Sequence, residues 1–323
     1  MAEFGIPYMG SKSSIVRKII DIFPSADNFY DLFGGGFSVT HGMLLYRKDS
    51  FKNFHFNEIR NGVCELIKDA IAGKYNYKVF KPKWIDRETF FREKENNAYI
   101  KICWSFGNNG KGYLFGTDIE EYKKSLHNAV VFDVYDNHFL KLFRGEEIPG
   151  KIKDITERRS WVKRKIKIIF NKLPESELKQ LQQLQQLERL EQLQQLEQLE
   201  RLEQLEQLER LHFTSVDYRE VNIKENSVIY CDIPYEGAAD YGKEFKHNEF
   251  YEWVLKQSNP VFVSEYARLE KRGLFLCRSI EKLSLLAGDG KERKVKNELI
   301  FCNEIAKKII EKKYEYMFRN NYL

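Results

Sequence analysis

The sequence predicts an α/β fold built on a doubly wound parallel sheet, with a basic segment inserted into it. Three observations lead to this prediction. A short apolar strand runs into the glycines Gly34 to Gly36, a second strand ends just before Glu58, and a buried-strand pattern resumes only at Val228. Between the first two strands and Val228 the alternation of strands and helices stops, as expected where another domain interrupts a sheet.

The helices and strands of the predicted sheet are recognised from their periodicity. In the first helix, Ile15, Ile19 and Phe23 recur at helical spacing and would face the core. The run from Val228 to Cys231 is continuously apolar, as parallel strands buried on both faces are. In chain order the predicted elements are a helix at 12–23, a strand at 28–33, a helix at 38–46, a strand at 51–56, a helix at 61–72, a strand at 228–231, a helix at 248–257, strands at 261–264 and 299–303, and a helical tail from 305.

The composition is that of a globular chain. With 323 residues and 42% hydrophobic side chains, it can bury a sizeable core, as one large domain with an insertion or as two domains. No apolar run approaches the roughly 20 residues of a membrane span, and Met1 to Lys18 lacks the apolar segment of a signal peptide, so we expect no membrane partner. The five cysteines are far apart and the six histidines are scattered, which argues against a metal site and predicts a reducing, cytoplasmic setting.

Charge is distributed unevenly along the chain. The formal net charge is +5, but residues 74–172 hold 22 Lys and Arg against 13 Asp and Glu, while residues 178–211 carry a net charge of −3. Aromatic and amide side chains are interleaved with the cations, a mixture that suits a polyphosphate backbone. A solvated helix face is the alternative explanation. The densest basic cluster consists of Arg158, Arg159, Lys163, Arg164, Lys165 and Lys167.

Residues 173–211 form a separate low-complexity insertion. Leucine occupies every third position from Leu178 to Leu211, with only Gln, Glu, Arg and Lys between the leucines. A spacing of three matches the 3₁₀-helix, in which residues i and i+3 eclipse, whereas Leu, Glu, Gln and Arg are strong α-helix formers. Both conformations therefore stay open, and the segment could serve self-association. The remaining chain divides into residues 1–73 with 212–323, which form the sheet, and the basic segment 74–172.

Glycine and acidic residues follow the first two strands. The run from Asp31 to Phe37 contains three consecutive glycines at a strand end, where glycine lets a ligand approach backbone amides closely. Glu58 lies just after the second strand and about 22 residues beyond the glycines, the place of the acid that binds ribose hydroxyls in nucleoside-binding α/β folds. Each feature alone could be structural, either a tight turn or a glutamate at a helix N-terminus.

A third set of polar groups follows the strand that ends at Cys231. The run from Asp232 to Tyr235 places a carboxylate, a main-chain carbonyl and an aromatic ring on one rim. Two acceptors and a stacking ring can hold an exocyclic amine on a flat base, although a plain proline turn is the simpler explanation of this run taken alone. The first residues, Gly5 to Lys12, add a glycine turn, an aromatic side chain and a lysine just before a helix.

Taken in order, these segments resemble the D12-class, Dam-like family of DNA adenine-N6 methyltransferases. That family has an N-terminal Pro-Tyr-x-Gly-Ser-Lys element, a Phe-x-Gly-x-Gly loop, an acid after the next strand and a late Asp-Pro-Pro-Tyr motif. The resemblance covers both ends and the middle of the chain, all but the leucine-triplet insertion. The similar segments here are Pro7 to Lys12, Phe33 to Phe37, Glu58, Asp232 to Tyr235, Trp104 to Gly116 (a recognition hairpin) and Glu298 to Ile300 (a late motif).

The resemblance implies a Rossmann-like methyltransferase sheet with an inserted, mostly helical target-recognition domain at 74–172. It implies S-adenosylmethionine as the cofactor and, as the methyl acceptor, the N6 amine of an adenine flipped out of double-stranded DNA. The implied catalytic residues are Asp232, Ile233, Pro234 and Tyr235. The implied cofactor-binding residues are Tyr8, Lys12, Asp31, Phe33, Gly34, Gly36, Glu58, Asp217 and Asp232.

DNA contacts are expected on the basic segment. The loop from Asn108 to Lys111 is the candidate for base edges, because asparagine pairs with adenine and lysine with guanine. The cluster from Arg158 to Lys167 is the candidate for phosphates. A cognate restriction endonuclease is a further partner that the resemblance suggests. The full set of expected DNA-binding residues is Asn108, Asn109, Lys111, Tyr113, Arg158, Arg159, Lys163 and Arg164.

One departure from the family pattern affects the catalytic motif. Its second position is Ile233 rather than proline, which keeps the carbonyl acceptor but fixes the backbone less rigidly. Methyl transfer to cytosine N4 or to a protein glutamine uses a related set of a polar side chain, a carbonyl and an aromatic ring, and stays an alternative. An aspartate at position 232, rather than a serine or an asparagine, favours adenine. A DNA-binding relative with an impaired catalytic loop and a scaffold built on the leucine triplets are the non-enzymatic alternatives.

Overall fold

The computed structural model describes residues 3–143, 152, 154–172, 191–205, 208–236, 245–283 and 295–319. Contacts between residues divide the chain into two units, each described by itself. Residues 3–6, 10–67 and those from 204 onward form the sheet unit, and residues 7–9 and 68–203 form the helical unit. Among the described residues, no helix combines the length and the apolar character needed to cross a membrane.

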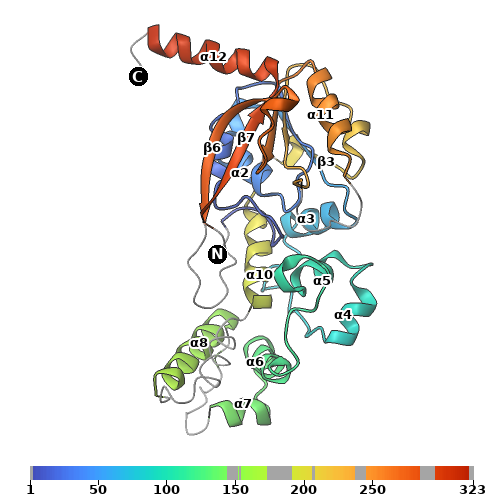
Figure 1. Cartoon of the computed structure of the whole chain (residues 1–323). Coiled ribbons are helices and arrows are strands. Elements are labelled where there is room, and N and C mark those ends of the chain that lie inside the picture. Colours follow the sequence, from blue (N-terminus) through green and yellow to red (C-terminus); the bar gives the residue numbers. More distant parts are fainter. Residues whose placement is uncertain are drawn as a thin grey trace. The chain divides into compact units, whose positions relative to one another are not determined.

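A seven-stranded sheet organises the sheet unit (Figure 1). Its strands lie in the order β3-β2-β1-β4-β5-β7-β6; the first five are parallel, and β7 is antiparallel to both β5 and β6. The chain moves outward from β1 to β3 and then returns to place β4 on the other side of β1, which confirms the predicted α/β sheet. The strands are β1 (Asn28–Asp31), β2 (Asn53–Asn57), β3 (Leu211–Thr214), β4 (Ser227–Cys231), β5 (Val261–Glu265), β6 (Phe275–Leu283) and β7 (Val295–Cys302).

Both faces of the central strands are buried, which explains why these strands are almost continuously apolar. On β4, Ile229 packs with Phe250 of α11 (His247–Lys256), a helix that Figure 1 shows beside the sheet. The next residue, Tyr230, points to the opposite face, where its ring centroid lies 5.6 Å from that of Phe23. Elements on both faces therefore fix the strand ends that carry the predicted site.

The sequence does not predict β3 and β6, although most other elements are confirmed within a few residues. β3 begins at Leu211, the last leucine of the triplets, so it shows no apolar run of its own. β6 is an edge strand in which charged residues such as Arg278 and Glu281 interrupt the apolar pattern, as edge strands tolerate. The first helix is also shorter than predicted: α1 spans Val16–Ile20, after a turn in which the carbonyl of Lys12 accepts from Ile15.

The remaining helices follow the expected alternation in the sheet unit and fill the helical unit. In the sheet unit these are α2 (Ser38–Tyr46), η1 (Lys48–Ser50), η5 (Leu208–Arg210), η6 (Tyr218–Glu220), η7 (Glu270–Arg272) and α12 (Glu304–Arg319), and α3 (Val63–Ile71) runs across the boundary of the two units. In the helical unit they are α4 (Arg87–Glu93), α5 (Ala98–Cys103), η2 (Phe106–Asn108), α6 (Glu120–Phe132), α7 (Asn137–Leu142), α8 (Ile155–Lys172) and α10 (Glu191–Glu200). The last residue of η4 (Arg201–Gln204) already belongs to the sheet unit.

The helical unit has a core of its own. α6 and α8 pack against each other and bury Val130, Trp161 and Ile166, and Leu193 of α10 joins the same cluster. The N-terminus of α7 is fixed by Asp136, whose Oδ1 accepts from the N–H groups of the second and third residues that follow it, both at 3.0 Å. This unit thus has a hydrophobic core and a capped helix of its own.

The described part of the leucine-triplet segment is helical, first α and then 3₁₀. α10 ends at Glu200, and η4 continues from Arg201. The four successive leucines from Leu193 to Leu202 are each 0% exposed. In an α-helix a spacing of three turns each leucine about 60° away from the last, and the change to a 3₁₀ turn, where i and i+3 eclipse, stops this drift. Both conformations that the sequence left open therefore occur; the triplets at 178–190 lie outside the described residues.

Two acidic residues of α10 pair with cations of the helical unit. Lys123 of α6 is buried, with its Nζ 2.8 Å from Glu191 Oε2, and Arg159 of α8 pairs with Glu197. Part of the basic excess of residues 74–172 is therefore neutralised within the unit itself. The buried leucines of the same stretch face this chain's own core, so they give the predicted self-association no support.

Replacing Leu196 with alanine should destabilise the protein by about 2–5 kcal/mol, because the change leaves a cavity under a fully buried leucine. Urea unfolding followed by circular dichroism measures this loss. Leu208→Ala is the matched control, since Leu208 is 39% exposed and its truncation should cost about 0.5 kcal/mol or less. If both changes lowered the free energy of unfolding by the same small amount, the burial of Leu196 in the core would be contradicted.

Candidate active site

The carboxyl ends of β1 and β4 meet where the strand order reverses, the position at which open α/β sheets bind ligands. Asp31 is the last residue of β1 and pairs in register with Tyr230, and Asp232 follows the last residue of β4. Glu58 follows the end of β2, the other neighbour of β1. The sheet thus gathers three predicted carboxylates, which are far apart in the sequence, at one edge.

Asp31 is a buried acid whose hydrogen-bonding capacity is only half used. Its Oδ2 accepts a hydrogen bond from the Thr40 hydroxyl at 2.8 Å, while its Oδ1 has no partner among the described residues. Burial raises the pKa of Asp31 to about 7, and the charges of Asp232 and Glu58 add to this rise. A buried acceptor without a partner suits a ligand that brings an N–H or O–H donor.

Glu58 holds the glycine turn in place. Its Oε2 accepts from the N–H of Gly35 at 2.8 Å, and its Oε1 accepts from the N–H of Arg60 at 2.9 Å. Burial raises the pKa of Glu58, an effect that Arg60 opposes. The neighbouring Ile59, which the sequence does not single out, is 60% exposed. An acceptor and an apolar side chain therefore lie next to each other beside the turn.

The glycine turn is shaped by packing within the protein. A Cβ atom on Gly34 would lie 2.0 Å from the ring of Phe56, and the carbonyl of Gly36 accepts from the N–H of Ile6 at 2.8 Å. Phe37 stands at the fifth position of the Phe-x-Gly-x-Gly pattern and has a φ of 67°, in the left-handed region that favours glycine. Its ring is fully buried, so packing offsets the backbone strain.

Asn57, which the sequence does not single out, ties three strand ends together. Its Nδ2 donates to the carbonyls of Leu32 and Val216 at 3.1 and 3.0 Å, and its Oδ1 accepts from the Thr214 hydroxyl at 2.8 Å. The loops that follow β1 and β3 are therefore fixed to the end of β2. The signal that could have found Asn57 is an amide at the end of a strand and directly before the predicted acid Glu58.

Three other predicted cofactor residues have contacts of their own. Asp217 accepts from Nε of Arg219 at 2.7 Å, and this hydrogen bond lowers the pKa of Asp217. The ring of Phe33 packs edge-on against that of Phe250, with 5.6 Å between centroids. Both residues lie on loops that follow β3 and β1, at the same edge of the sheet as Asp31. Tyr8 is half-buried and belongs to the helical unit.

The Asp-Ile-Pro-Tyr motif forms a polar cluster with Lys12 and Glu298. Lys12 Nζ lies 2.7 Å from Asp232 Oδ1 and 3.5 Å from Glu298 Oε1, and it donates to the Tyr235 hydroxyl at 2.5 Å. That hydroxyl in turn lies 2.9 Å from Asp232 Oδ1 and within hydrogen-bond distance of Glu298. Burial opposes the charge of Lys12, but the two carboxylates outweigh it and raise the pKa of Lys12. Lys12, which the resemblance groups with the cofactor residues, therefore contacts the catalytic motif directly.

The main chain of the motif is held from two sides. His247 Nε2 donates to the carbonyl of Pro234 at 2.7 Å, and Glu265 Oε2 accepts from the N–H of Glu236 at 3.3 Å. Ile233 is 2% exposed and packs in the core cluster of α11. Packing and hydrogen bonds thus restrain the loop at Ile233, the position at which the family pattern has the first of its two prolines.

In the helical unit, the loop from Asn108 to Lys111 is a tight turn whose amides also serve the fold. Asn108 Nδ2 donates to the carbonyl of Ile102 at 3.0 Å, and Asn109 Oδ1 accepts from the N–H of Lys111 at 2.8 Å. Asn108 itself has a φ of 56°, which asparagine adopts more readily than most residues. These bonds give the loop a defined shape, and Lys111 is exposed at its surface.

Tyr113 and Phe106 differ in accessibility on this same loop. Tyr113 is 6% exposed, and its hydroxyl donates to the carbonyl of Ile85 at 2.6 Å. We therefore no longer expect Tyr113 to contact DNA, because its ring and its hydroxyl are both used inside the unit. Phe106, at the start of the turn, is 67% exposed and is the aromatic side chain that the loop presents to solvent.

Arg158 and Arg159 are buried rather than presented to phosphates. Arg158 donates from Nε and Nη2 to two carbonyls at the C-terminal end of α6, at 2.6 and 3.3 Å, and Arg159 pairs with Glu197. Both side chains are thus used inside the unit, by the last carbonyls of α6 and by Glu197, and their burial gives the expected DNA contacts no support. Lys163 is half-buried and Arg164 is exposed, so the solvent-facing part of the cluster lies further along α8.

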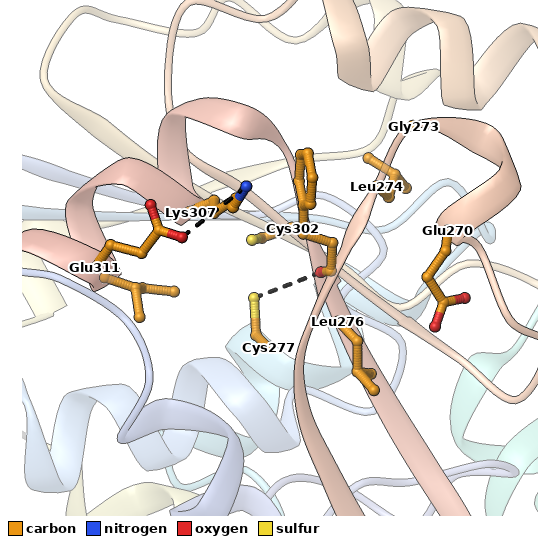
Figure 2. Close-up of a pocket in the computed structure, with 10 residues that line it drawn as sticks. Glu270, Gly273, Leu274, Leu276, Cys277, Cys302, Lys307 and Glu311 are labelled. Carbon is orange, nitrogen blue, oxygen red and sulfur yellow. Dashed lines mark hydrogen bonds and ion pairs between the residues drawn. The ribbon is translucent and has the colours of Figure 1, made fainter. Parts of the chain in front are cut away.

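A cavity of about 390 Å³ lies elsewhere in the sheet unit, between β6, β7 and α12 (Figure 2). Figure 2 shows Lys307 and Glu311 facing each other, with Nζ and Oε1 3.9 Å apart, and Cys277 near Cys302. None of the residues that line it is a predicted site residue. We therefore assign this cavity no part in the reaction.

The fold and the site together define a class of protein. A parallel sheet with an antiparallel β7, a glycine turn after β1 and acids at the ends of β1, β2 and β4 are the layout of an S-adenosylmethionine-dependent methyltransferase. The family model of the D12 class N6 adenine-specific DNA methyltransferases matches residues 8–253, and the chain belongs to this family. A search of the curated proteins found no match. The protein transfers a methyl group from S-adenosylmethionine to N6 of adenine in double-stranded DNA.

The raised pKa of Asp31 predicts a pH-dependent stability. An acid whose pKa rises on folding from 3.8 to about 7 binds protons more tightly in the folded state, so stability falls as the pH rises through this range. Asp31→Asn keeps an acceptor for Thr40 and should remove this fall, leaving the variant more stable above about pH 8 by on the order of 4 kcal/mol at most. Urea unfolding at several pH values measures the difference, and parallel pH curves for the two proteins would contradict the prediction.

Proposed function

We propose that Asp232 and the main-chain carbonyl of Ile233 accept the two N–H groups of the adenine N6 amine, while the ring of Tyr235 contacts the base. The observation that carries this proposal is the state of the Asp232 side chain. It is 22% exposed at the carboxyl edge of the sheet, yet its Oδ1 is held by Lys12 at 2.7 Å and by the Tyr235 hydroxyl at 2.9 Å. A partly accessible carboxylate held by buried partners is pre-organised to accept a donor.

The proposed chemistry follows from the weakness of the amine as a nucleophile. The N6 lone pair is delocalised into the purine ring, which makes N6 a poor nucleophile. Hydrogen bonds from both N–H groups favour a pyramidal nitrogen, on which the lone pair is localised and can attack the methyl group. When bound, S-adenosylmethionine supplies a methyl group on a strongly electrophilic sulfonium. Asp232 and Ile233 then act by positioning and polarising the amine, and Asp232 accepts the proton that the methylated nitrogen loses.

We assign cofactor binding to the acids and the glycine turn beside this motif. Asp31 Oδ1, buried and without a partner among the described residues, would accept a hydrogen bond from the cofactor. Glu58 would accept hydrogen bonds from the ribose hydroxyls of the cofactor, and the exposed Ile59 beside it would cover one face of the cofactor's adenine ring. Phe33, Gly34, Gly36 and Asp217 complete the proposed set at this edge of the sheet.

We further propose that the helical unit is the target-recognition domain. The exposed Lys111 and Phe106 would approach the bases, and Lys163 and Arg164 would contact phosphates, which positions the protein without reading sequence. Because N6 cannot be reached inside a duplex, the target adenine must leave the stack. A cognate restriction endonuclease stays a prediction of the resemblance, and the cytoplasm is the compartment that we propose.

Asp232→Ala should abolish methyl transfer, with a loss on the order of 10²–10³-fold or more, while S-adenosylmethionine affinity changes little. Transfer of tritiated methyl groups to unmethylated duplex DNA measures activity, and calorimetry measures cofactor affinity. Asp27→Asn, an acid at the opposite end of β1 that pairs with Lys52, is the matched control. Nucleoside analysis should find N6-methyladenine; N4-methylcytosine as the product would favour the alternative substrate, and a fully active Asp232→Ala protein would remove Asp232 from the site.

Arg164→Ala should weaken DNA binding and reduce the slope of log affinity against log salt by about 0.9, the contribution of one phosphate contact. Fluorescence anisotropy over a salt series measures both quantities. Lys52→Ala is the control, because Lys52 pairs with Asp27 near the amino end of the sheet. An unchanged slope in Arg164→Ala would exclude this arginine from the phosphate contacts.

A further inference from the structure

Glu298 belongs to the late segment that resembles the family, for which the resemblance implied no role. It lies beyond residues 8–253, which match the family model, and it completes the polar cluster around the Asp-Ile-Pro-Tyr motif. It is 0% exposed, and its Oε1 contacts both the Tyr235 hydroxyl and Lys12 Nζ, the latter at 3.5 Å. Its Oε2 is buried and has no hydrogen-bond partner among the described residues. A buried carboxylate that is only partly satisfied destabilises the fold. Its contacts with the motif are what offset this cost.

The position of Glu298 is fixed by the sheet. On β7, the next residues Leu299 and Ile300 pair with Glu265 and Ser264 of β5, and Glu298 itself pairs with Ile280 of β6. A strand that is bonded on both sides cannot shift without breaking both ladders. The Glu298 carboxylate is therefore held rigidly against Tyr235 and Lys12, as a positioning group needs to be.

The charges of the cluster explain what Glu298 can do there. Lys12 is 2.7 Å from Asp232, and an ammonium that belonged to Asp232 alone would weaken this carboxylate as an acceptor for the target amine. Glu298 is a second carboxylate for the same ammonium. Burial raises the pKa of Glu298, and Lys12 opposes this rise. A second lysine, Lys282, contributes its charge at the edge of the cluster and donates to a main-chain carbonyl at 3.2 Å.

We propose that Glu298 is a positioning residue for methyl transfer: it orients the Tyr235 hydroxyl and takes up part of the hydrogen-bonding capacity of the Lys12 ammonium, so that Lys12 is not bound by Asp232 alone and Asp232 stays available as an acceptor for the amine. Glu298 acts through these two side chains and does not itself touch the base. The proposal rests on the proposed role of Asp232 as the amine-binding carboxylate.

The test compares Glu298→Gln, which keeps the shape and removes the charge, with Glu298→Asp, which keeps the charge one methylene further away. The Gln variant should lose on the order of 10- to 100-fold in kcat, with the KM values for S-adenosylmethionine and unmethylated duplex DNA within about twofold of wild type. The Asp variant should recover part of kcat. Glu304→Gln is the matched control, since this nearby acid is exposed at the start of α12 and pairs with Lys308.

The outcomes separate this proposal from the one on which it rests. Wild-type kcat in a folded Gln variant would overturn the role of Glu298, and so would an equal loss of kcat and of cofactor affinity, which a merely structural residue produces. Asp232→Ala is measured in parallel, and if it remains active, the assignment of Asp232 fails instead. Should circular dichroism show that the Gln variant does not fold, the Asp variant decides: a reduced kcat with normal cofactor affinity supports the proposal, and a wild-type kcat overturns it.

Discussion

The crowding of acids at the carboxyl edge of the sheet is the constraint on which the rest of this structure depends. Parallel strands end at one edge, so Asp31, Glu58 and Asp232 are forced together in a place that buries the first two and leaves Asp232 partly exposed. Burial raises the pKa of Asp31 and of Glu58, while Asp232 pairs with Lys12 at 2.7 Å. Perturbed acids of this kind destabilise a fold and are typical of sites that bind ligands and react with them.

The loops that carry these acids contain little regular secondary structure. Hydrogen bonds from side chains fix their conformation. Asn57 joins the ends of three strands, Glu58 holds the N–H of Gly35, and His247 holds the carbonyl of Pro234. The last of these contacts bears on the unusual motif. Proline in place of Ile233 would restrict the backbone by its ring, whereas here the burial of Ile233 and the bond from His247 restrain the same loop. The same requirement for rigidity is met by different physical means.

The helical unit shows how far net charge can mislead about a surface. Residues 74–172 are strongly basic, but Lys123 and Arg159 are buried and paired with acids of the leucine-triplet helix. Arg158 is likewise used to bind helix-end carbonyls. The triplet segment is therefore part of the core that it enters: its leucines fill that core and its glutamates balance cations. The proposed DNA contacts therefore rest on a smaller set of exposed side chains, among them Lys111 and Arg164.

The sequence by itself determined the α/β class, because the order of strand, glycines, helix, strand, acid and helix is typical of a doubly wound sheet. It also placed Asp31, Glu58 and Asp232 at strand ends, and the parallel pairing of these strands brings those ends to one edge. The tertiary structure alone decided which partners these groups have. Glu298, Asn57 and His247 reach the site through strand register and loop conformation, and Arg158 is distinguished from Arg164 only by the helix face that packs. The local sequence pattern determines which helix, strand or loop a residue belongs to. Contacts between residues that are distant in the sequence depend on how these elements pack against one another.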